Sequence, residues 1–172
     1  PWDNELVLLD TGEIAVKIAK LILKSGGACH YIDEKKDSTL SLAAISGDTE
    51  IVSLLIKGGA DVNFKDARNA TPLITASMLA SAEVIKILAD AGADINYRFG
   101  SSENALTAAM MMKKHSNAIF LAGLGADPNA VSSSNGYSPL DFAVFNNAPP
   151  EVFEALIKAG ANVNYTNPKN KR

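Results

Sequence analysis

The sequence has little of what most metal and catalytic sites are built from. Its 172 residues include one cysteine, Cys29, and two histidines, His30 and His115. A single thiol excludes an internal disulfide framework and a cysteine zinc site, and two histidines are too few for a histidine-rich metal centre. We therefore expect neither a metal nor a cofactor.

Long hydrophobic runs and excess positive charge are also missing. No apolar run approaches the ~18 residues that a membrane-spanning helix needs. Sixteen Lys and Arg residues stand against nineteen Asp and Glu residues, so the net charge is −3, whereas nucleic-acid-binding domains usually carry a basic face. These absences predict no membrane insertion and no nucleic-acid partner. The hydrophobic content still suffices to bury the core of one domain.

What the sequence does have is an internal repeat. The motif Gly-Ala-Asp-Val-Asn at 59–63 returns, with changes, at 92–96, 125–129 and 160–164, after a degenerate copy at 27–31. The first glycines of these motifs are 32, 33, 33 and 35 residues apart. A second marker, a leucine near a Thr or Ser, follows in phase at Leu40, Leu73, Leu106 and Leu140. Two markers in phase over four copies indicate tandem repeats.

Each period predicts two helices and a turn. Thr71-Pro72 places a good N-cap before a proline at the first helical position, and Ser138-Pro139 repeats this arrangement. The second helix carries apolar residues at i, i+3 and i+4, as in Val84, Ile87 and Leu88, and it ends at a glycine. One such unit cannot bury its apolar stripe, but stacked units can, which predicts an elongated solenoid.

These residues resemble ankyrin repeats, through the period, Thr-Pro-Leu and Gly-Ala-Asp-Val-Asn. The resemblance implies an all-α solenoid of stacked antiparallel helix pairs with β-turn or hairpin tips. We expect a single domain over residues 1–172, with a divergent N-terminal repeat at 1–30, repeats at 31–65, 66–98, 99–131 and 132–165, and at 166–172 a tail or the start of a further repeat.

Two departures from the family pattern bear on the stack. Ala80 stands where a loop glycine is common. Asn117 stands where the neighbouring units have Ile51 and Val84, so it either reaches solvent or weakens the stack locally. Near the end, 167–170 resembles the tip of a further unit.

The titratable residues do not suggest catalysis. Cys29 and His30 are adjacent, so on a turn their side chains diverge and no base faces the thiol. His115 follows two lysines, and we expect it in a solvated loop between helices. Asp61, Asp94 and Asp127 recur with the repeat and are interpreted as structural turn residues. No acid, base and nucleophile converge, so we expect no enzyme and no catalytic residue.

The family resemblance places partners on the concave side, which the tips and first helices form. Two positions per unit, five and six residues after the marker leucine, would face it, and most of them are apolar. These side chains either fill the core between helices or form a binding patch, for which methionine is well suited. At the tips we expect Arg68 and Tyr137 to be exposed. The candidate protein-binding residues are thus Ile45, Arg68, Met78, Leu79, Met111, Met112, Tyr137 and Phe145.

The sequence therefore favours a non-enzymatic interaction module. We expect a cytoplasmic monomer that binds a partner protein or peptide through the concave groove. The alternative is a targeting or regulatory segment of a larger protein whose catalytic domain lies outside this chain. The first residue, Pro1 rather than Met, favours that alternative and leaves export or a periplasmic location open.

Overall fold

The computed structural model describes residues 21, 38–100 and 103–170. Within them the chain is helical and forms no strand. Cys29, His30 and most of the expected N-terminal repeat lie outside the described residues. The helices are α2 (Thr39–Ser46), α3 (Thr49–Lys57), α4 (Pro72–Leu79), α5 (Ala82–Asp90), α6 (Ala105–Met111), α7 (His115–Gly123), α8 (Pro139–Phe145) and α9 (Pro150–Lys158), followed by the 3₁₀ helix η2 (Pro168–Asn170).

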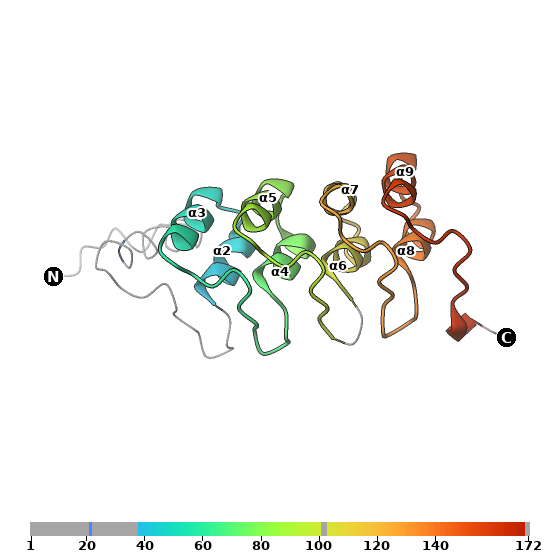
Figure 1. Cartoon of the computed structure of the whole chain (residues 1–172), viewed down its shortest axis with the longest axis horizontal. Coiled ribbons are helices and arrows are strands. Elements are labelled where there is room, and N and C mark those ends of the chain that lie inside the picture. The colour runs from blue at the N-terminus through green and yellow to red at the C-terminus, as the bar shows by residue number, and fades with distance from the viewer. Residues whose placement is uncertain (1–20, 22–37, 101–102, 171–172) are drawn as a thin grey trace, which may run out of the picture.

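The helices form two parallel rows (Figure 1). Helices α2, α4, α6 and α8 make the inner row, and α3, α5, α7 and α9 make the outer row. The principal contacts join the two helices of a pair or successive helices of one row. Loops project from the inner row on one side. The predicted solenoid of antiparallel helix pairs is confirmed.

The core follows from the two sequence markers. The marker leucines Leu40, Leu73 and Leu106 are fully buried in the inner row. Leu55, Leu88 and Leu121 are buried from the outer row. Small residues at several other buried positions, such as Ala44, Ala76 and Ala109, let the helices approach closely. The close packing holds each unit against its neighbour.

The joint between the two helices of a unit requires an unusual backbone. Gly47 adopts a left-handed conformation, with φ of 75°, and so do Lys113 (57°) and Asn147 (51°) at the corresponding positions. Ala80 departs from this pattern, because its backbone is extended, with φ of −90° and ψ of −172°. A left-handed conformation is costly for residues other than glycine. The unit that has an alanine here therefore joins its two helices through an extended residue instead.

The loops between units form hairpin tips, as predicted. The backbone N–H of Asp66 donates to the Ala70 carbonyl at 3.0 Å, and that of Ser132 donates to the Tyr137 carbonyl at 2.8 Å. In the middle tip, Phe99 and Glu103 form an isolated antiparallel bridge. These short pairings present the loop residues along one side of the array.

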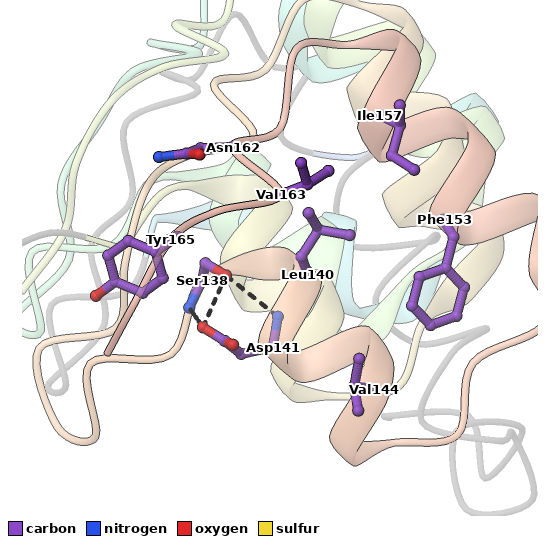
Figure 2. Close-up of a pocket in the computed structure, with 9 residues that line it drawn as sticks. All are labelled: Ser138, Leu140, Asp141, Val144, Phe153, Ile157, Asn162, Val163 and Tyr165. Atoms are coloured by element: carbon purple, nitrogen blue, oxygen red, sulfur yellow. Dashed lines mark hydrogen bonds between the residues drawn. The ribbon is translucent and has the colours of Figure 1, made fainter. Parts of the chain in front are cut away.

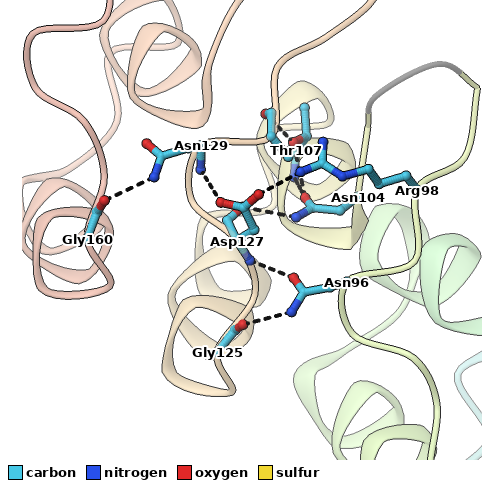
Figure 3. Close-up of polar contacts among 9 residues, drawn as sticks. Asn96, Arg98, Asn104, Thr107, Gly125, Asp127, Asn129 and Gly160 are labelled. Carbon is cyan, nitrogen blue, oxygen red and sulfur yellow. Dashed lines mark hydrogen bonds and ion pairs between the residues drawn. The ribbon is translucent and has the colours of Figure 1, made fainter.

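In three copies of the Gly-Ala-Asp-Val-Asn motif, the closing asparagine joins one unit to the next (Figure 3). Asn96 Nδ2 donates to the Gly125 carbonyl at 3.1 Å, and Asn96 Oδ1 accepts from the Asp127 N–H at 2.7 Å. Asn63 and Asn129 make the same two bonds to the units that follow them. We call these three pairs of bonds the asparagine ladder. The sequence showed the asparagine repeating but not that it bonds the next unit.

The expectation that Asn117 reaches solvent is wrong. The other expectation, that it weakens the stack locally, stays a prediction. Its side chain is buried, and its Nδ2 donates to the Ser77 carbonyl at 3.1 Å and to the Ala80 carbonyl at 3.0 Å. These carbonyls lie at the end of α4, where a helix has no partners of its own for its last carbonyls. The Asn117 amide therefore supplies a hydrogen-bond donor to carbonyls at the end of α4, in the preceding unit.

Candidate functional site

A line of apolar side chains lies exposed along the inner row. Each of its members is between 41% and 73% exposed. A core role is therefore ruled out for them, which separates two interpretations that the sequence left open. We call this set the inner-helix stripe: Ile45 on α2, Leu79 on α4, Met111 and Met112 at the end of α6, and Phe145 on α8.

Met78, another candidate binding residue, is not part of the inner-helix stripe. Its side chain is half-buried and packs against the hydrophobic core. Met110, next to Met111 in sequence, is completely buried. Successive residues of a helix point about 100° apart, so a run of three methionines divides between the core and the surface.

The two tip residues expected to be exposed behave differently. Arg68 is exposed, but its guanidinium bonds the buried Asp66 carboxylate, with Nη2 to Oδ2 at 2.8 Å. Tyr137 is half-buried instead of exposed, because its ring packs edge-on against Phe142, with centroids 5.5 Å apart, and also contacts the ring of Phe145. Tyr137 thus packs against Phe145 of the stripe and adds little exposed surface of its own.

Two cations and one apolar residue beside the stripe were not predicted. Lys113 and Lys114 are exposed directly after Met112, so positive charge adjoins the centre of the stripe. Val144 is exposed beside Phe145. Sequence spacing could have found the lysines, because they follow the two methionines, whereas Val144 occupies a position that is buried in the other units.

Polar groups under the tips are structural. The Asp61, Asp94 and Asp127 carboxylates each accept the backbone N–H two residues later. The buried Glu103 carboxylate accepts from the Ser133 N–H at 2.8 Å and from the Ser133 hydroxyl at 2.9 Å. Burial alone raises the pKa of Glu103, but the bonds from Ser133 and Ser132 outweigh it and the net pKa is lowered.

The described residues offer no arrangement suited to metal binding. No group of three or more His, Cys, Asp or Glu side chains among them could hold an ion. His115 is not in a solvated loop as expected, because it begins α7 and its Nε2 is buried without a hydrogen-bond partner in the described structure. No helix in the same residues has the length and apolar character to cross a bilayer.

Comparison with known families gives two matches. A family model described as "Ankyrin repeats (3 copies)" matches residues 12–99, and one described as "Ankyrin repeat" matches residues 135–168. A search of curated proteins found no match. The first match alone spans half of the chain and reaches to the residues just before α6.

Proposed function

Since the chain belongs to the ankyrin repeat family, whose members are in general protein-interaction modules, we propose that it binds a partner protein or peptide through the inner-helix stripe. The observation that carries this proposal is the exposure of Leu79, Met111, Met112 and Phe145 on successive inner helices. Large exposed apolar patches mark interaction surfaces, and the stripe repeats exposed apolar side chains on successive helices of one row. The family is typically non-catalytic, in keeping with an interaction role.

The chemistry of the stripe favours a partner with an apolar face. Methionine side chains are flexible and polarizable, so Met111 and Met112 can adapt to the shape of a bound helix or peptide. The scaffold beneath them is held by buried leucines and alanines, and a preformed surface loses little conformational entropy on binding. Lys113 and Lys114 would favour acidic residues at the edge of the partner's apolar face.

The test is affinity capture with the whole chain as bait, comparing the wild type with Leu79→Glu/Met111→Glu. Charges at the centre of the stripe should abolish capture of specific partners, while the far-ultraviolet circular dichroism and melting temperature stay close to wild type because both side chains are already exposed. The matched control is Leu124→Glu, which adds a charge to an exposed apolar residue at the end of α7 in the outer row.

Two results would contradict the proposal. Capture by the double variant equal to that of the wild type would place the binding surface elsewhere. A loss of capture with Leu124→Glu as large as that with the double variant would mean that charge anywhere on the array disturbs binding.

A further inference from the structure

The last helix pair has an apolar face that no part of the described chain covers. One side of α8 and α9 packs on α6 and α7. The opposite side encloses a shallow hollow of about 290 Å³ (Figure 2). Its apolar lining consists of Leu140, Val144, Phe153, Ile157 and Val163. We call this surface the terminal face.

The repeat register shows what covers this surface in the other units. Val144 lies four residues after the marker leucine of its unit, and the corresponding residues are Ala44, Ser77 and Met110. Those three are 0% exposed, whereas Val144 is 70% exposed. The units share one architecture, so the difference arises because another inner helix follows each of the first three units.

The outer helix and the turn give the same result independently. Phe153 corresponds to Val52, Ile85 and Ala118, each completely buried, yet Phe153 is half-buried. In the turn, Val163 is 64% exposed, while the corresponding Val62 and Ile95 are half-buried and Pro128 is buried. A terminal unit that faces water is expected to have a polar outer surface, and this one does not.

The asparagine ladder stops at the same place. Asn164 is the counterpart of Asn63, Asn96 and Asn129, each of which bonds a Gly carbonyl and a backbone N–H of the following unit. No side-chain hydrogen bond of Asn164 forms within the described part of the chain, although its backbone is held by Asn162 as in the other turns. Its amide thus has both its donor and its acceptor available.

The tip that would lead to a following unit is already in position. The Tyr165 hydroxyl donates to the Gly136 carbonyl at 2.8 Å, and Asn167 Nδ2 donates to the Asn135 carbonyl at 2.9 Å. Lys169 Nζ reaches the Ser134 carbonyl at 3.1 Å. Residues 165–170 therefore dock on the preceding tip, and in the earlier units a docked tip leads straight into an inner helix.

We propose that the terminal face receives one more helix pair of this chain's own repeat type, entering directly from the tip at 165–170. Its apolar stripe would cover Val144, Phe153 and Val163. Its Gly-Ala-Asp turn would supply the carbonyl and the N–H that Asn164 bonds. This occupant fits better than an unrelated partner or a second copy because it alone satisfies the apolar face, the amide and the tip together.

The experiment extends the full 172-residue chain after Arg172 by a helix pair copied from itself. Three versions are made, with residues 38–63, 71–96 or 138–164 appended, so that a misfit of one helix pair does not decide the outcome. Urea unfolding should show a higher midpoint for at least one extended chain than for the original, because apolar surface is buried.

Two substitutions test whether the gain in stability arises at the terminal face. Asn164→Ala should leave the original chain unchanged but lower the folding equilibrium constant of the stabilised extended chain by about three- to tenfold, the effect of losing one or two hydrogen bonds. Val144→Lys should be tolerated in the original chain, where the residue is exposed, and should cancel most of the gain in the extended one. Asn164→Gln is the conservative control.

Three results would overturn the proposal. One is that none of the three extensions raises the midpoint. Another is that the gain survives Val144→Lys unchanged. The third is that sedimentation shows the original chain as a dimer that Val144→Lys dissociates, since the occupant would then be a second copy. The stripe variant Leu79→Glu/Met111→Glu should not alter the gain, so this test is independent of the partner-binding proposal.

Discussion

At Asn117 a buried amide occupies a position that neighbouring units fill with Ile51 and Val84, and it bonds the last carbonyls of α4. Asn117→Val should therefore lower the free energy of unfolding by about 1–3 kcal/mol, because two buried carbonyls lose their donor. Chemical denaturation measures the change, with Ser116→Val as control, since Ser116 is exposed on the same helix. A more stable Asn117→Val variant would show that the amide is a defect.

Lys113 illustrates a cost of backbone conformation at a single residue. Its φ of 57° is left-handed, a conformation that glycine adopts without strain. Lys113→Gly should raise the free energy of unfolding by about 0.5–1 kcal/mol, the relief of strain being partly offset by the greater entropy of the unfolded chain. Lys114→Gly is the matched control, because it removes the same charge at a φ of −82° and should destabilise.

Among the elements, the tip bridge between Phe99 and Glu103 contains a buried carboxylate whose contribution to stability depends on pH. The folded pKa of Glu103 lies below its ordinary value of about 4.5, so the unfolded chain takes up the proton first as pH falls. The stabilisation is complete above that value and is lost as pH drops through the lower, folded pKa. Between pH 7 and pH 3, the wild type should lose more stability than Glu103→Gln.

Urea unfolding at several pH values measures this difference. Glu151→Gln, at an exposed site on α9, provides the control and should follow the wild-type profile. Equal acid sensitivity of the wild type and Glu103→Gln would mean that the serine bonds to Glu103 contribute nothing to the stability of the tip.

The helices could be predicted from the sequence better than the contacts between them. Thr71-Pro72 and Ser138-Pro139 do begin α4 and α8, because capping depends on residues only a few positions apart. Whether Met110 or Met111 faces solvent depends on the rotation of α6 against its neighbours. The bond from Asn117 to Ala80 spans 37 residues, and no local rule contains that information.

Over the whole molecule, stability should vary with the number of neighbours that a unit has. Helices α4 to α7 are packed by units on both sides, whereas α8 and α9 have the terminal face open. Amide hydrogen exchange should be slower in α4–α7 than in α8 and α9, since repeat arrays open from unsupported units. Equal protection throughout would indicate all-or-none opening.

The asparagine ladder also determines how the array responds to ionic strength. Its bonds join neutral amides to backbone groups, and such bonds neither titrate near neutral pH nor weaken as salt screens charge. The ion pair between Arg98 and Asp127, half-exposed beside the same turn, is of the opposite kind and should fade in concentrated salt. We therefore expect the spacing of successive units to be the same in dilute and in saline solution.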